Sequence, residues 1–347
     1  VMAIDRDGIT NALWGDSTFT PVPFNFPEYG DFYDADRKAQ YSYNPERAKE
    51  FLGKSGYKGQ ELGWHITRGF YPNYEAAAES VPGAIGLSSS TVSRSFIQAS
   101  AATLREFQER DLSREDVVAL FLDGKAFADS TMVIALGITI SGEKRVLGFV
   151  ETDTENAKVL TPFLRSLVER GLDASQGLLV ILDGGKGLRS AVKKVFRDRA
   201  LVHRCQWHKR ENVVSYLPKT EQADWRRRLQ RAYNRPKYEE ALAALEKLHA
   251  ELEDRNQSAA GSLTEGLEET LTLHRLGVFA LLGRSFKTTN CLESVNALVE
   301  ERCAKVDHWK NSSQRQRWLA TALVDIEPRL RKVIGYRHLP KLREALK

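Results

Sequence analysis

Two apolar runs, each followed by an aspartate, constrain the fold of this chain more than any other feature. Residues 117–122 (VVALFL) precede Asp123, and residues 177–182 (GLLVIL) precede Asp183. Short apolar runs rich in strand-forming residues are typical of buried strands. A carboxylate at the mouth of such a strand is costly unless something binds it. Glu293 lies just inside a predicted helix start, and together the three acids could hold hard divalent cations.

The segments around these acids predict a mixed α/β fold. Two strands at 132–140 and 144–151 are joined by a hairpin at 141–143. A capping box at 152–155 is predicted to open a helix that stops at Gly171. An amphipathic helix and a short strand follow the second aspartate. The predicted order, β-β-β-α-β-α-β, is the topology of the ribonuclease-H-like fold, in which carboxylates on the first and fourth strands meet at one edge of a mixed sheet.

Four motifs, in this order, resemble the Mutator-type transposases of bacterial insertion sequences, which belong to the DDE class. The motifs are FLDGK at 121–125, LDGGKGL at 182–188, RCQWHKREN at 204–212 and TTNCLESVN at 288–296. The resemblance covers about residues 81–347. Because four separate motifs match in the same order, the resemblance is specific.

The resemblance also implies how this part of the chain is divided. It implies a ribonuclease-H-like core at 113–209, a helical insertion at 210–285, and a carboxy-terminal catalytic helix and tail at 286–347. The 110 residues that separate Asp183 from Glu293 fit this division, because the family carries a helical insertion before the last catalytic helix.

The resemblance implies that Asp123, Asp183 and Glu293 are the catalytic residues. They would hold two Mg²⁺ or Mn²⁺ ions about 3.5–4 Å apart, and oxygen ligands favour these metals over zinc. The implied reaction is strand cleavage at the element ends, followed by strand transfer into target double-stranded DNA, with no covalent enzyme intermediate. We expect a homodimer or a higher oligomer, because two ends must be paired.

Each acid also has a structural interpretation. The spacing from Asn290 to Glu293 is that of a capping box, so Glu293 could instead satisfy a backbone donor. The neighbouring pair Glu300-Glu301 offers competing metal ligands. Asp183 precedes Gly184-Gly185 and could be an ordinary turn former. The match to the family motif favours Glu293, and two aspartates on comparable strands favour a shared site.

The pair Cys205-x-x-His208 invites a zinc interpretation, which requires two further ligands. Cys291 and Cys303 form no second pair. The family carries a Cys-x-x-His motif beside its catalytic core, so we expect these residues to shape the site; their chemistry, like the role of Asn290, stays open. Three cysteines without a signal peptide favour a reducing cytoplasm. No segment reaches the roughly 18 apolar residues of a membrane span.

Composition divides the chain near residue 80. Residues 1–80 contain 15 of the 32 aromatic residues and have a net charge of −4, whereas residues 81–347 have a net charge of +9. A basic segment suits a polyanionic partner, although net charge supports only non-specific attraction. The difference between the two segments predicts two different origins.

Residues 1–80 resemble a fragment of the oligopeptide-type solute-binding proteins of ABC importers. The matching stretches are MAIDRDGI at 2–9, YNPERAKEFL at 43–52 and SGY at 55–57. We therefore expect a foreign amino-terminal fragment, fused when a mobile element interrupted a gene, with no transport function of its own. The alternative is an unusual native amino-terminal domain.

Residues 81–112 are predicted to be a partial helix-turn-helix and a linker. The stretch 86–94 (GLSSSTVSR) resembles the turn and recognition helix, and it would present Ser90, Thr91 and Arg94 to DNA. Little remains of the preceding helix, so we expect weakened recognition of transposon ends. The alternative is a Ser-rich helix start on the surface.

Two basic stretches, 225–235 and 329–347, have two interpretations. They are solvated helix faces, or they contact phosphate. For the whole chain, the alternatives to a transposase are a non-catalytic DNA-binding or oligomerising remnant of one and a peptide-binding fragment of an importer.

Overall fold

The computed structural model describes residues 43–55, 89–127, 130–153, 156–304, 306 and 308–347. They belong to two compact units, Val1–Gln98 and Ala99–Lys347. The first unit contains the helix α3 (Pro45–Lys54), which has no buried residue and is capped by the side chain of Asn44. The helix α5 (Ser89–Glu109) crosses the division between the units. The remainder of the predicted foreign fragment lies outside the described residues.

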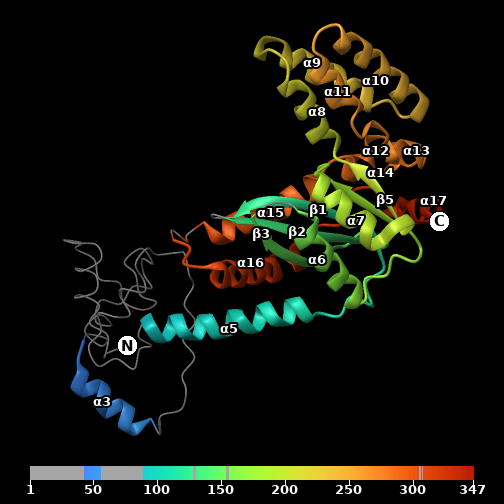
Figure 1. Cartoon of the computed structure of the whole chain (residues 1–347). Coiled ribbons are helices and arrows are strands. Elements are labelled where there is room, and N and C mark those ends of the chain that lie inside the picture. The colour runs from blue at the N-terminus through green and yellow to red at the C-terminus, as the bar shows by residue number, and fades with distance from the viewer. Residues whose placement is uncertain (1–42, 56–88, 128–129, 154–155, 305, 307) are drawn as a thin grey trace, which may run out of the picture. The chain divides into compact units, whose positions relative to one another are not determined.

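A five-stranded mixed sheet forms the centre of the second unit (Figure 1). The strands are β1 (Val117–Phe127), β2 (Ser130–Thr139), β3 (Lys144–Thr152), β4 (Leu178–Leu182) and β5 (Ala200–Arg204). Their order is β3-β2-β1-β4-β5; β2 is antiparallel to both β1 and β3, while β1, β4 and β5 are parallel. The connections use α6 (Ala157–Glu169), α7 (Lys186–Phe196) and the 3-10 turn η2 (Arg197–Arg199). The predicted β-β-β-α-β-α-β order is confirmed.

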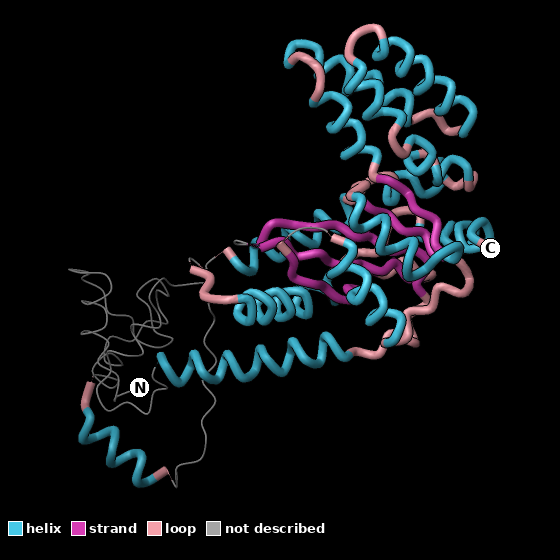
Figure 2. The backbone as a smooth tube through the Cα atoms, viewed as in Figure 1, coloured by secondary structure: helices cyan, strands magenta, loops and turns pink. Residues whose placement is uncertain are grey.

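Helices make up most of the chain after β5 (Figure 2). The segment between β5 and the last acid contains α8 (Gln206–Ser215), α9 (Lys219–Tyr233), α10 (Tyr238–Glu253), α11 (Gln257–Thr264), α12 (Leu267–Thr270), α13 (Thr272–Arg275) and α14 (Phe279–Phe286). The rest consists of α15 (Asn290–Cys303), α16 (Ser312–Ile326), η3 (Glu327–Arg329), η4 (Tyr336–His338) and α17 (Leu339–Leu346). No helix in the described ranges is both long and apolar enough to cross a membrane.

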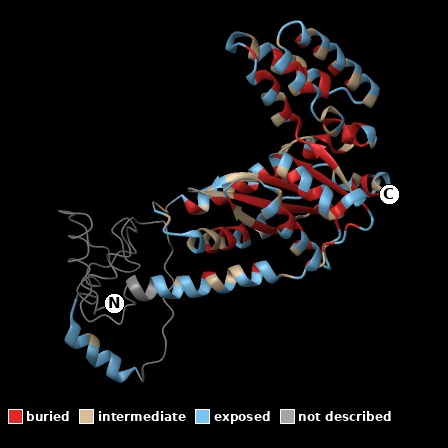
Figure 3. Ribbon diagram, viewed as in Figure 1, coloured by how far each residue is buried: buried red, intermediate tan, exposed pale blue. Residues whose placement is uncertain are grey.

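The sheet separates two hydrophobic cores, which Figure 3 shows as buried strands between helices. On β4, Leu178, Val180 and Leu182 pack with α6 and α7, whereas Leu179 and Ile181 belong to the core made with α15, α16 and α17. All five side chains are fully buried, and burying one aliphatic side chain of this size stabilises a fold by about 1.5–3 kcal/mol. A third core is formed by the helices α8, α9, α10 and α11, which pack around Trp225.

Two local predictions are wrong. The helix α6 does not start from a capping box at 152–155, because Asn156 is the N-cap and its side chain accepts bonds from two backbone N–H groups. The tail 329–347 is not simply a solvated helix face. Leu339 and Leu342 are fully buried in it, and the guanidinium of Arg343 donates to Asp116 and to the carbonyl of Val117.

Candidate active site

Asp123 and Asp183 lie side by side at one edge of the sheet. In the parallel pair β1–β4, Leu122 aligns with Leu182, and the next residue after each of them is one of the two aspartates: Asp123 within β1 and Asp183 just after β4. Asp123 does not end its strand as predicted, because β1 continues to Phe127 by pairing with β2. The side chain of Asp123 is therefore held within the sheet and is only 9% exposed.

Asp183 forms a turn with Gly184 and Gly185, which is the structural interpretation that the sequence allowed for this residue. Its Oδ1 accepts a hydrogen bond of 2.7 Å from the backbone N–H of Gly185. No group in the described part of the chain binds its Oδ2. The turn and a ligand role are therefore compatible, because the turn orients the carboxylate and uses only one of its two oxygens.

Glu293 lies on the first turn of α15, where the hydroxyl of Thr289 donates to its Oε1 over 3.1 Å. Thr289 is fully buried and is the N-cap of the helix, so the predicted capping box that begins at Asn290 is not formed. Asn290 is exposed and is the first residue of α15. The bond that Glu293 accepts therefore comes from a side chain.

The three acids share one electrostatic environment. Burial raises the pKa of Asp123 to about 6, and the charges of Asp183 and Glu293 add to this effect, while His208 opposes it. The competing acids are held in ion pairs, since Glu300 pairs with Lys125 and its neighbour Glu301 pairs with Arg302. Of these three glutamates, Glu293 is the one whose charge is among the main causes of the raised pKa of Asp123.

The carboxylates do not form a ready-made coordination cage. Within the described ranges, no group of three or more His, Cys, Asp or Glu side chains is placed to hold a metal ion. Two properties of the site nevertheless suit hard divalent cations: all three donors are carboxylates, and burial together with the charges of Asp183 and Glu293 raises the pKa of Asp123. A cation between them would relieve this repulsion.

Cys205 and His208 form a pair next to the aspartates. Burial lowers the pKa of His208, but the bond to Cys205, the charge of Cys205 and the charges of Asp123 and Asp183 outweigh it and raise the pKa to about 9. Burial raises the pKa of Cys205, and the bond to His208 outweighs that effect and lowers it. The pair and the nearby aspartates therefore favour the protonated imidazolium form of His208.

The zinc interpretation is not supported. The other two cysteines are elsewhere: the thiol of Cys291 donates to the carbonyl of Ser285, and Cys303 is buried on α15. The Cys205 sulfur instead lies 3.7 Å from the hydroxyl oxygen of Thr289, whose single proton is donated to Glu293 over 3.1 Å. The Cys-x-x-His motif is thus connected to the third acid through one buried threonine.

Sequence reasoning missed two buried cations beside this site. The side chain of Arg204 lies against Gly184, whose φ is +106° and where a Cβ atom would come within 1.9 Å of the Arg204 Nε. Arg204 and Lys209 both donate to the backbone carbonyl of Glu265. These bonds connect the end of β5 and the helix α8 to the residue that follows α11. The motifs contain both cations, but no local pattern indicates their shared partner.

The predicted DNA-contacting residues Ser90, Thr91 and Arg94 lie at the start of α5. Arg94 is exposed. The preceding turn at 86–88 lies outside the described residues, so the partial helix-turn-helix stays a prediction.

Comparison with known proteins places the chain in a family. Residues 73–332 match the family described as "Transposase, Mutator family". The chain belongs to this family. The match begins at residue 73, whereas the resemblance was predicted to start at about residue 81. Residues 73–80 therefore belong to the family match and not to the predicted foreign fragment. A solute-binding origin for the residues before 73 stays a prediction.

Three relatives show how far the similarity extends. The chain is 29% identical over 266 residues to the transposase for insertion sequence element IS6120 of Mycolicibacterium smegmatis, which covers 75% of this chain and 80% of the relative. It is 27% identical over 253 residues to the transposase for IS256 in transposon Tn4001 of Staphylococcus aureus, with coverages of 68% and 63%. For the transposase of IS905 from Lactococcus lactis the identity is 29% over 235 residues, with coverages of 66% and 58%. The chain thus spans about three-fifths of the length of the last two.

Proposed function

We propose that this chain is a DDE-type DNA transposase with a ribonuclease-H-like core, and that Asp123, Asp183 and Glu293 are its catalytic residues. The observation that carries the proposal is that Asp123 and Asp183 directly follow the paired residues Leu122 and Leu182 of two adjacent parallel strands, together with the effects of Asp183 and Glu293 on the pKa of Asp123. Family membership supports the same conclusion. The helical segment at 210–285 is then the proposed insertion before the catalytic helix α15.

The proposed cofactor is Mg²⁺ or Mn²⁺, held by the three carboxylates. When bound, two such ions would activate the attacking oxygen and stabilise the departing one in phosphoryl transfer. The residues of the chain prepare this site. Thr289 orients Glu293 through its hydroxyl, and the turn at Gly185 orients Asp183. The charge of His208 offsets part of the negative charge of the aspartates.

The proposed partner is double-stranded DNA, both transposon ends and target, with the chain acting in the cytoplasm as a homodimer or higher oligomer. Ser90, Thr91 and Arg94 would contact the ends, but with weakened selectivity if the helix-turn-helix is partial. Binding would then depend mainly on contacts of Lys and Arg with phosphate, which carry little sequence information.

The test is a cleavage and strand-transfer assay on end-containing and scrambled DNA, with Asp183→Asn as the inactive variant. Glu300→Gln is the matched control, because Glu300 is a nearby acid that pairs with Lys125. We expect Mg²⁺-dependent cleavage of both DNAs by the wild type and the control, and none by Asp183→Asn. Activity that survives Asp183→Asn would refute the site. DNA binding without cleavage by the wild type would favour a non-catalytic remnant, and strong preference for true ends would refute weakened recognition.

A further inference from the structure

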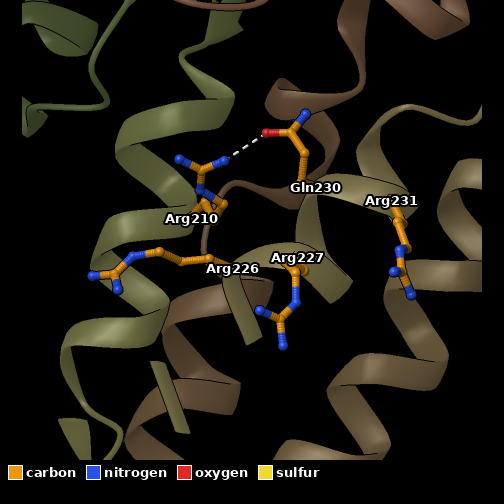
Figure 4. A pocket seen from close by; sticks show the side chains of 5 residues that line it. All are labelled: Arg210, Arg226, Arg227, Gln230 and Arg231. Carbon is orange, nitrogen blue, oxygen red and sulfur yellow. Dashed lines mark hydrogen bonds between the residues drawn. The ribbon is translucent and has the colours of Figure 1, made fainter. Parts of the chain in front are cut away.

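A group of arginines lines an open pocket between α8 and α9. The pocket has a volume of about 440 Å³ and is lined by Arg210, Arg226, Arg227, Gln230 and Arg231. Figure 4 shows these side chains, with Arg210 bonded to Gln230. The pocket lies in the helical segment, and its lining includes none of the three catalytic acids.

Helical spacing explains why these arginines share one side of α9. Arg227 and Arg231 are four residues apart, as are Arg226 and Gln230, so both pairs lie on the same side of the helix. The opposite side contains Trp225 and Leu229, which are buried in the third core.

Arg228, in the same basic run, has a different environment. Its guanidinium lies 4.3 Å from the ring centroid of Trp225 and pairs with Glu251 of α10. Arg228 is therefore used for packing between helices, whereas its neighbours Arg227 and Arg231 are exposed. The basic run thus contains one structural arginine and several that face solvent.

The acidic residues around the pocket neutralise only part of its charge. Glu211 is shared by Arg210 and Arg226, and Asp224 pairs with Arg227. Four arginines and two carboxylates give a net charge of +2. Arg231 has no hydrogen-bond or ion-pair partner for its side chain within the described ranges. Guanidinium groups suit phosphate because they present several N–H donors in one plane.

The positive surface extends from this pocket to the catalytic helix. Arg210 donates to Gln230 over 2.6 Å. The amides of Gln230 and Asn234 are joined by a bond of 3.0 Å, and Lys287 donates to the same Asn234 oxygen over 3.0 Å. Burial and the charge of Arg210 lower the pKa of Lys287. The Asn234 amide holds Lys287 in place without neutralising it, while Arg210 bonds to the Gln230 amide and shares Glu211 with Arg226.

The helix α8 also connects the pocket to the acids. It begins next to Cys205 and carries His208, which interacts with the charges of Asp123 and Asp183. Trp207 on the same helix is 43% exposed, one turn before Arg210. The helix α8 thus carries both Arg210 of the pocket and the His208 that interacts with the aspartates.

We propose that the arginine face, defined as Arg210, Arg226, Arg227, Arg231 and Lys287, binds the phosphate backbone of double-stranded DNA and leads it toward the acids. This inference rests on the proposed function. It assigns a second DNA-binding surface to the helical segment, separate from the predicted contacts of α5. The contacts are with phosphate, so the surface holds DNA of any sequence.

The test compares two double variants of the full chain, each lacking two positive charges of the helical segment. Arg227→Gln with Arg231→Gln removes the two exposed arginines of the pocket and leaves the Glu211 contacts intact. Lys237→Gln with Lys247→Gln is the control, because both lysines are exposed and neither lines the pocket. Gel shifts with a short random-sequence duplex are measured over a series of salt concentrations.

We expect the arginine pair to weaken binding on the order of 10-fold or more at 0.1 M salt, and to reduce the slope of log K against log salt by about 2, since each lost phosphate contact removes about 0.9. The lysine pair should change both quantities much less. Equal effects of the two pairs, or none, would overturn the inference. So would an arginine pair that alters self-association in sedimentation but leaves DNA binding unchanged.

The same assays separate this inference from the proposed function. Asp183→Asn should bind the duplex like the wild type and fail to cleave it. If the wild type binds through the arginines but never cleaves, the proposed function fails and the inference stands. If the wild type cleaves and the arginine pair binds normally, the inference fails and the proposed function stands.

Discussion

Replacing Asp123 by asparagine is expected to stabilise the chain at neutral pH when no divalent ion is present. Asp123 is nearly buried, at 9% exposed, and its carboxylate is adjacent to two like charges. Asparagine has almost the same size but no charge. The substitution should therefore remove a repulsion that the folded chain tolerates only because the acid is needed for its proposed role.

The magnitude follows from the pKa. Burial, with the charges of Asp183 and Glu293, raises the pKa of Asp123 from 3.8 to about 6. A raised pKa means that this group favours folding fully below pH 3.8 and that the contribution is lost as the pH rises through about 6. The loss is about 3 kcal/mol, at 1.36 kcal/mol for each pKa unit. The charge of His208 lowers the pKa of Asp123, and the value of about 6 already includes this effect. The loss of about 3 kcal/mol therefore needs no further correction for His208.

The assay is urea unfolding with a chelator present, at pH about 4 and about 7.5. Asp123→Asn should be about 3 kcal/mol more stable than the wild type at the higher pH and nearly equal at the lower pH. Asp254→Asn is the control, since Asp254 is exposed at the end of α10. Adding Mg²⁺ should stabilise the wild type more than Asp123→Asn, because a ligand stabilises the state that binds it. A variant that is less stable at neutral pH, or whose gain is the same at both pH values, would refute the reasoning.

Two further predictions concern single hydrogen-bonding groups. The hydroxyl of Thr289 donates to Glu293 over 3.1 Å, so Thr289→Val should reduce cleavage and cost about 1 kcal/mol of stability. Thr289→Ser keeps the hydroxyl and should retain both the cleavage activity and the stability. Equal activity of the two variants in a cleavage assay would contradict this. Burial raises the pKa of Glu151, but bonds from α16 side chains outweigh it and lower it from 4.5 to about 2. The ionised Glu151 carboxylate therefore stabilises the folded chain by about 3 kcal/mol. This stabilisation is present above pH 4.5 and is lost as the pH falls toward about 2. Acid unfolding of Glu151→Gln should therefore lack this part of the pH dependence, and a curve parallel to that of the wild type would count against it.

Local sequence patterns predicted the order of strands and helices in the second unit because these patterns report burial directly. The run before Asp183 is apolar throughout, and β4 is buried on both faces. Gly171 ends its helix with a φ of +105°, a conformation that suits glycine. Helix starts were harder to predict, since several residues near 152–156 are competent caps and Asn156 is the one used.

The sequence by itself determined which acids close the apolar runs and which residues have helical or strand periodicity. Only the tertiary structure decided which groups meet. The Thr289 hydroxyl contacts the sulfur of Cys205, 84 residues away in the sequence, and Arg228 packs on Trp225 while the adjacent Arg227 faces solvent. The physical reason is that periodic burial is a property of neighbouring residues along the chain. Contacts between distant residues instead depend on strand register and on how helices pack, which no short stretch of sequence contains.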